Sequence, residues 1–173
     1  MYNAAMTELG AALVMTLALV GCGGGSGGSP STQSAPCSFT VSGGPGGQFA
    51  CIVAVQYSSA SGLSELTMGV TNASPFDGIT ISAGEQGMVA AQSTWTNTDS
   101  GAVGAIELTQ GGMIWGAGST SPPQGSYSFA FSSASVDVST GGDTVYNVHG
   151  QWSAVAPPLP GETGTTLNLT GSF

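Results

Sequence analysis

The side chains that could carry acid–base or nucleophilic chemistry are few in this sequence. It contains one histidine, His149, and neither lysine nor arginine. A serine hydrolase would need His149 beside an acid such as Asp137 or Asp143, together with one of the many serines. With a single histidine and no cationic side chain, the groups available for general acid–base catalysis are limited. We therefore expect no enzyme, and a hydrolase is the least favoured of the functions considered.

The carboxylates are the only charged side chains, and they are scattered singly along the chain. The nine acids are Glu8, Glu65, Asp77, Glu85, Asp99, Glu107, Asp137, Asp143 and Glu162. Because contacts to nucleic-acid phosphates need cations, a formal net charge of -9 argues against binding DNA or RNA. Asp99, Asp137 and Asp143 stand near turn signals and carry the oxygen ligands that calcium prefers, but no EF-hand spacing is present. We expect no metal site and no cofactor.

Two tryptophans are candidates for a ligand-binding surface. Trp95 and Trp115 have polar or glycine neighbours, which leaves surface and core equally open for them. If both lie on one exposed face beside amide and hydroxyl groups, they could hold a sugar. Trp152, Tyr127 and Phe129 stand in strictly alternating runs and are expected in the core.

The elements that must position these residues are predicted to be strands. Hydrophobic residues make up 40% of the chain, and from residue 37 onwards they alternate with polar residues in short runs between Gly, Pro, Ser and Asp turns. The runs expected to form strands are Gln48–Tyr57, Leu66–Val70, Ile79–Ile81, Met88–Thr96, Val103–Thr109, Met113–Trp115, Tyr127–Phe131, Val136–Val138, Val145–Val155 and Leu167–Phe173. Nine to eleven strands with no amphipathic helix predict an all-β fold, an antiparallel β-sandwich-like single domain over residues 37–173.

The N-terminal segment carries the most specific motif in the sequence. Leu9–Val20 is an apolar run of 12 residues, which is too short to span a bilayer as a helix. It leads directly into Leu19-Val20-Gly21-Cys22, and this arrangement resembles the lipobox of bacterial lipoproteins. The resemblance implies a signal peptide over residues 1–21, cleavage before Cys22 and fatty acyl chains on that cysteine.

The resemblance also implies a cellular location for the protein. Residues 22–36 form a tether rich in glycine, serine and proline, which would let the domain stand away from the lipid surface. Two or three acyl chains hold a protein firmly to a membrane, whereas one holds it only marginally. Gly23, rather than aspartate, follows the lipidated cysteine, and in this family that favours the outer membrane.

The two remaining cysteines are expected to form a structural disulfide. In an oxidising compartment, Cys37 and Cys51 are left as a pair once Cys22 carries lipid. A hairpin centred on Gly44 would place Cys37 opposite Cys51 and Phe39 opposite Phe49. Their spacing does not fit a Cys-x-x-Cys redox motif, and one histidine cannot complete a zinc site.

Together these features predict a membrane-anchored cell-envelope lipoprotein of unknown, non-catalytic role. The alternative is a carbohydrate- or other ligand-binding β-sandwich module that uses Trp95 and Trp115. The expected partners are the membrane, through the lipid anchor, and a glycan or another envelope protein.

Overall fold

The computed structural model of the protein describes residues 35–118 and 124–173, and these fold into ten strands. The strands are β1 (Ala35–Ser42), β2 (Gly47–Ser58), β3 (Leu63–Val70), β4 (Gly78–Gln86), β5 (Thr94–Thr96), β6 (Val103–Gln110), β7 (Met113–Gly118), β8 (Ser126–Thr140), β9 (Asp143–Ala156) and β10 (Leu167–Ser172). All pairings are antiparallel, so the predicted all-β class is confirmed. Across the described ranges, no helix has the length and apolar character needed to cross a bilayer.

Alternation of apolar and polar residues determines which side of each strand is buried. In β1 from Pro36 onwards, and in β9 from Tyr146 onwards, every second side chain is buried and its neighbours are exposed. The buried set includes Trp115, Phe39, Phe129, Leu66 and Leu169, each at most 2% exposed. These side chains form one cluster with the other buried hydrophobic residues, and this cluster is the core of a single domain.

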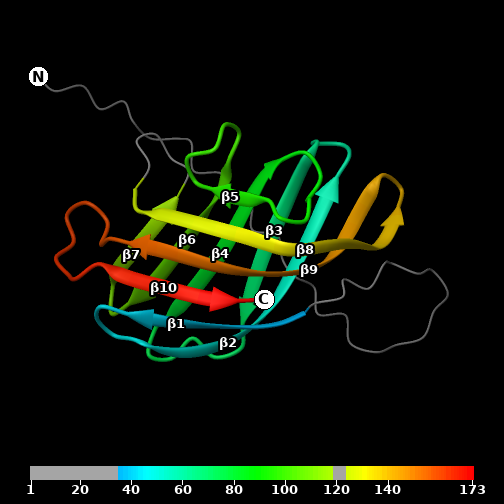
Figure 1. The fold of residues 1–173 in the computed structure, drawn as a ribbon. Coiled ribbons are helices and arrows are strands. Elements are labelled where there is room, and N and C mark those ends of the chain that lie inside the picture. Colours follow the sequence, from blue (N-terminus) through cyan, green and yellow to red (C-terminus); the bar gives the residue numbers. More distant parts are fainter. Residues whose placement is uncertain (1–34, 119–123) are drawn as a thin grey trace, which may run out of the picture.

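The strands form one sheet that folds over into two layers (Figure 1). The order is β5-β8-β9-β10-β1-β2-β3-β4-β6-β7, with an additional pairing between β9 and β2. We call β8, β9, β10, β1 and the first half of β2 the front layer, because they face the viewer in Figure 1. The back layer consists of β3, β4, β6 and β7, and the core lies between the two layers.

The β9–β2 pairing closes the sheet where the short strands β1 and β10 end. The first half of β2 pairs with β1, while Val55 to Ser58 pair with Tyr146 to Asp143 of β9. On the other side of the molecule, the outer edge of β7 is bonded to the segment that follows β9. The Gly116 amide donates to the Pro157 carbonyl, and the Leu159 amide donates to the Ile114 carbonyl. The sheet therefore has barrel-like closure, which leaves fewer unpaired edges for other chains to join.

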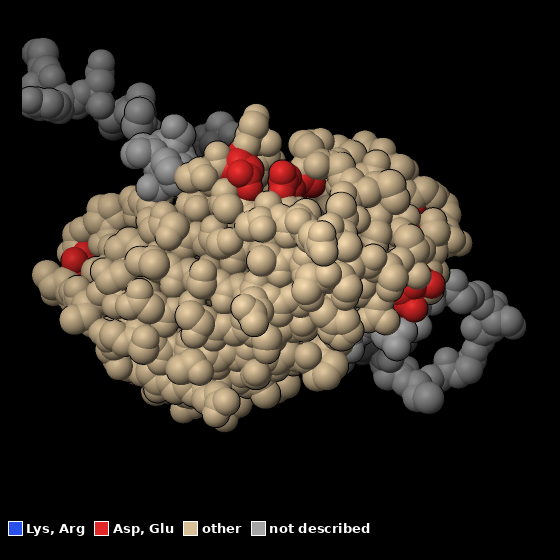
Figure 2. Space-filling view, in the orientation of Figure 1, with Lys and Arg blue, Asp and Glu red and all other residues tan. Residues whose placement is uncertain are grey.

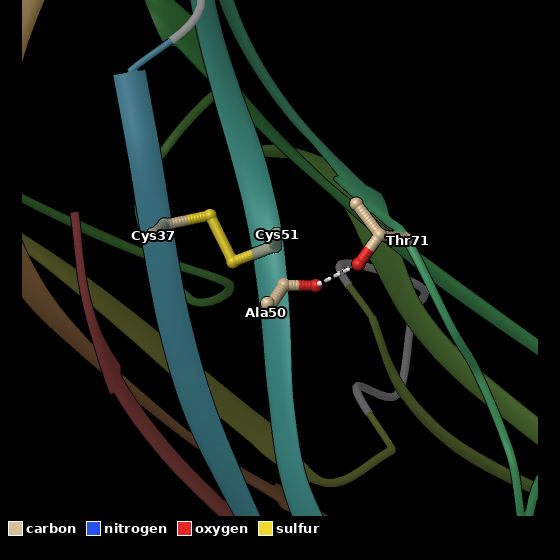
Figure 3. Close-up of a disulfide and its surroundings, with 4 residues drawn as sticks. All are labelled: Cys37, Ala50, Cys51 and Thr71. Atoms are coloured by element: carbon tan, nitrogen blue, oxygen red, sulfur yellow. Dashed lines mark hydrogen bonds between the residues drawn. A yellow bond between two sulfur atoms is a disulfide. The ribbon is translucent and has the colours of Figure 1, made fainter.

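The first hairpin has the predicted register. Cys37 pairs with Cys51 and Phe39 with Phe49, and a disulfide joins the two cysteines across a Cα–Cα distance of 4.8 Å (Figure 3). On the other edge of β2, the Thr71 hydroxyl donates to the Ala50 carbonyl. The strand begins two residues before the expected domain boundary at residue 37, because Ala35 already pairs with Val53.

Two strand predictions differ from the structure. Of the stretch predicted from Met88 to Thr96, only Thr94–Thr96 forms a strand, since a glycine turn with positive φ at Gly87 ends β4 and the following residues form an extended connection and a turn. The two runs predicted around Phe129 and Val136 belong instead to one strand of 15 residues, β8. Two irregularities in the β8–β9 register interrupt the alternation there, so the sequence pattern alone suggests two strands.

Candidate functional site

The outward side chains of the front layer, and of β5 paired to its edge strand β8, line up in rows that cross the strands. In antiparallel pairs, residues directly opposite each other project on the same face. The strand registers therefore join six residues in a first polar row: Thr96, Ser128, Ser153, Thr170, Thr40 and Gln48. A second row lies two residues further along each strand: Thr94, Ala130, Gln151, Ser172, Ser38 and Ala50. The first row consists entirely of hydroxyl and amide side chains, and the second contains four such residues and two alanines.

A shallow groove of about 510 Å³, which we call the polar groove, runs between these rows. Its walls are side chains of the two rows on β8, β9, β10, β1 and β2. Its floor includes Phe39, Trp152 and Gly171, which lie between the rows on their strands. A second groove of about 490 Å³ lies beside it and shares Ala130, Gln151 and Ser172 as a common wall. The front face therefore carries two adjacent, open grooves with polar walls.

The chemistry of the front face follows from what its strands lack. Eight of the nine acids fall within the described residues, and none of them lies in either row or lines either groove. Glu65, Glu85 and Glu107 lie on back-layer strands, Asp137 and Asp143 near the turn between β8 and β9, and Asp77, Asp99 and Glu162 between strands. Figure 2 shows acid atoms only near the border of this face, and the broad area between them is uncharged. The area of the two rows and the two grooves can donate and accept hydrogen bonds but presents no aspartate or glutamate side chain.

Hydroxyl and amide groups alone set a limit on what such a face can hold. A neutral hydrogen bond contributes a net of about 0.5–1.5 kcal/mol, whereas association costs an estimated 4–15 kcal/mol in lost translational and rotational freedom. A small ligand that reaches two or three hydroxyls would therefore bind very weakly. Only an extended ligand that contacts many residues along the rows could gain enough favourable contacts.

The predicted aromatic ligand-binding surface is wrong. Trp95 is 5% exposed and Trp115 is 2% exposed, so both belong to the core. Trp95 packs edge-on against Phe131 with ring centroids 4.7 Å apart. The Trp115 indole packs edge-on against Phe76 and donates its N–H to the Thr165 carbonyl at 3.0 Å. Polar and glycine flanks misled the sequence reading because both residues occupy inward positions of short strands next to turns. The core positions predicted for Trp152, Tyr127 and Phe129 are confirmed.

His149 has the predicted orientation. It is exposed on β9, between Val148 and Gly150, which are buried. The side chain lines the second groove, whose other walls come from serine, threonine, glutamine and alanine, with no aspartate or glutamate side chain. The arrangement that a Ser-His-Asp hydrolase requires is not assembled by the residues lining this groove.

The acids named as calcium candidates do not converge. Asp99 accepts a hydrogen bond from the Thr96 amide and caps the turn after β5, whereas Asp137 and Asp143 lie far away along the β8–β9 hairpin. In the part of the chain that the structure describes, no three histidine, cysteine or acidic residues come close enough to hold a metal ion.

One acidic pair is electrostatically coupled at the rim of the sandwich. Burial raises the pKa of the Glu85 carboxyl, and the nearby Asp99 carboxylate raises it further. Burial also raises the pKa of Tyr127, with smaller contributions from the same two acids. The Tyr127 hydroxyl donates to the Val103 carbonyl at 3.1 Å and so joins the front layer to the back layer. These contacts give the rim a structural role.

Sequence reasoning missed the two polar rows, although their signal is present in the alternation of six strands. The exposed residues of β1 and β10 are all uncharged: Pro36, Ser38, Thr40 and Ser42 on β1, and Asn168, Thr170 and Ser172 on β10. The rows appear only when the registers between strands are known, and the sequence alone does not supply those registers. The predicted lipidation site, Cys22, lies outside the described residues.

Comparison of the chain with models of protein families, with curated proteins and with solved structures found no match.

Proposed function

We propose that this chain is a bacterial cell-envelope lipoprotein, held at the membrane by acyl chains on Cys22, with a non-catalytic β-domain displayed beyond it. The observation that carries the proposal is the motif Leu19-Val20-Gly21-Cys22 at the end of the apolar run. The Cys37–Cys51 disulfide supports it, because such bonds form and persist in oxidising compartments outside the cytosol. The short interval of 12 residues between Cys22 and the first strand suits a tether.

Intact-mass measurement of the membrane fraction tests the proposal. The expected mass is that of the chain from Cys22 onwards plus a diacylglyceryl group and, where the amine is acylated, one further fatty acyl chain. Cys22→Ala should remain unprocessed and unlipidated, whereas Cys37→Ala, which removes a different cysteine, should keep both modifications. Wild-type protein that is unmodified at Cys22 and found in the cytosol would contradict the proposal.

A second candidate function, ligand binding by the domain, is favoured by a separate observation. The grooves of the front face are open and bordered by side chains that can donate or accept hydrogen bonds. This candidate replaces the version based on Trp95 and Trp115, since both are in the core. It is compatible with the anchor, because many copies on one membrane would strengthen weak contacts to a multivalent ligand.

A further inference from the structure

We infer that the polar groove binds a neutral polysaccharide chain laid across the strands of the front layer. This inference rests on the ligand-binding role proposed above and names the class of ligand. Its basis is the combination of groove shape, the chemistry of the two rows and the distribution of charge over the molecule.

Charge selects the class of polymer. The protein carries nine acids and no lysine or arginine, so an anionic polymer such as nucleic acid or an acidic glycan is repelled by the molecule as a whole. A cationic polymer would be attracted to the acids, but these lie at the border and on the back layer, away from the groove. The groove itself offers hydroxyl groups of Ser153, Thr170 and Thr40 and the amides of Gln151 and Gln48. Its natural complement is a ligand rich in hydroxyl groups and free of charge.

Length selects a polymer over a single sugar. The groove is lined by residues from five strands, β8, β9, β10, β1 and β2. Four spacings of about 4.8 Å between them give a length of about 19 Å, which suits several consecutive sugar units. A row of neutral contacts, each weak, binds measurably only when one ligand engages many of them.

A second copy of this chain is a poorer occupant of the same face. The centre of a stable protein interface is usually more apolar than the surrounding surface. Here both rows present hydroxyl and amide groups, which would be buried in a face-to-face dimer without defined partners. Two copies would also each bring a formal charge of -9.

The test removes hydroxyl groups without changing shape or charge. Thr170 and Thr40 are paired neighbours at the middle of the first polar row, and both are exposed. Thr40→Val/Thr170→Val takes away two hydroxyls and keeps β-branched residues that favour strands. The matched control is Thr67→Val/Thr80→Val, the same substitutions at exposed positions of β3 and β4 on the back layer. Thermal unfolding of both variants checks that they remain folded.

The readout is retardation of the full-length protein, in detergent, during native electrophoresis through gels that contain dextran, mannan, mixed-linkage β-glucan or alginate. Retardation is expected with at least one neutral polymer and not with alginate, and 1 M salt should leave it unchanged because no charged contact is involved. The dissociation constant should rise about tenfold in Thr40→Val/Thr170→Val and stay unchanged in the back-layer control.

Four results would overturn the inference. One is the absence of retardation by all three neutral polymers, and another is equal retardation of the two double variants. The third is a dimer in sedimentation that Thr40→Val/Thr170→Val dissociates, since the face would then be an interface between copies. The fourth is binding of another class of ligand that depends on Thr40 and Thr170. It would overturn the assignment of the ligand as a neutral polysaccharide and leave the ligand-binding role standing. Lipidation at Cys22 is measured separately by mass and is unaffected by any of these results.

Discussion

The two outer faces of this sandwich obey the same alternation rule but differ in charge. Across the two polar rows of the front layer the outward residues are serine, threonine, glutamine and alanine, and the acids of its strands, Asp137 and Asp143, lie away from the rows near the β8–β9 turn. On the back layer Glu65 projects from the middle of β3 and Glu107 from the middle of β6. Solubility alone would be served by acids on either face. The difference therefore fits the binding of a neutral ligand that is proposed for the front face, where charged side chains would disturb the contacts.

The largest expected difference in stability between the two layers comes from the packing beneath the front face. Gly171 occupies an inward-facing position of β10 under the polar groove. A Cβ atom added there would lie 2.5 Å from the Trp152 Nε1 atom and 2.6 Å from the Phe39 Cβ atom. Gly171→Val should lower the free energy of unfolding by more than about 3 kcal/mol, because the core is already filled there. Urea unfolding measures the change.

Gly69→Val on the back layer is the matched control for that substitution. Gly69 is exposed on β3, and a Cβ atom there would meet only the Ile52 side chain, whose Cγ1 atom would be 3.3 Å away and would need to shift slightly. Valine suits an exposed strand position, so the control should be neutral or slightly stabilising. Equal losses for the two variants would show that the front layer is no more tightly packed under its grooves than the back layer is at its surface.

The disulfide tests whether the front layer depends on a covalent link that the back-layer hairpin lacks. Cys37→Ala/Cys51→Ala should destabilise the protein by about 3 kcal/mol, since the bond closes a loop of about 15 residues and restricts the unfolded chain. Reduction of the parent protein should lower its urea midpoint by a similar amount, whereas the double variant should not respond to reductant. An unchanged midpoint in both experiments would contradict the stabilising role.

Asn97 connects the two layers, and its loss should have an intermediate effect. The buried amide donates to the Gly118 and Gly125 carbonyls, and its oxygen accepts from the Tyr127 amide at 3.2 Å. Asn97→Ala leaves these backbone groups without their partner and should cost about 2 kcal/mol of unfolding free energy. Asn147→Ala, at an exposed position of β9, should change stability by less than about 0.5 kcal/mol. Comparable losses of unfolding free energy in the two variants would contradict the role of Asn97 in connecting the layers.

Much of this fold could be predicted from the sequence, because alternation and turn residues are local signals. The register of the first hairpin followed from the positions of Cys37, Phe39, Phe49 and Cys51 around a glycine-rich turn. The burial of Trp95 and Trp115 could not be predicted, since each is a single aromatic residue whose flanking residues fit a surface or a core equally well. The polar rows were also beyond reach, because they depend on long-range pairing such as that of Thr170 with Thr40.

The smallest expected effect concerns the acids that are kept away from the front face. Burial, and then the charge of Asp99, raise the pKa of Glu85 above the ordinary value of 4.5. The folded protein therefore binds a proton at Glu85 more tightly than the unfolded chain does, so this group makes stability fall as pH rises through the window just above 4.5. Glu85→Gln should stabilise the protein at pH 7 by a few tenths of a kcal/mol at most, because the carboxyl is largely solvated.

Glu107→Gln, which removes one exposed charge from β6, controls for the general loss of negative charge. Chemical unfolding of both variants at pH 7 and pH 4 should show the advantage of Glu85→Gln over Glu107→Gln at the higher pH only. If the stability advantage of Glu85→Gln persists at pH 4, it must come from better packing of the amide. Repulsion between the Glu85 and Asp99 carboxylates would then not be its cause.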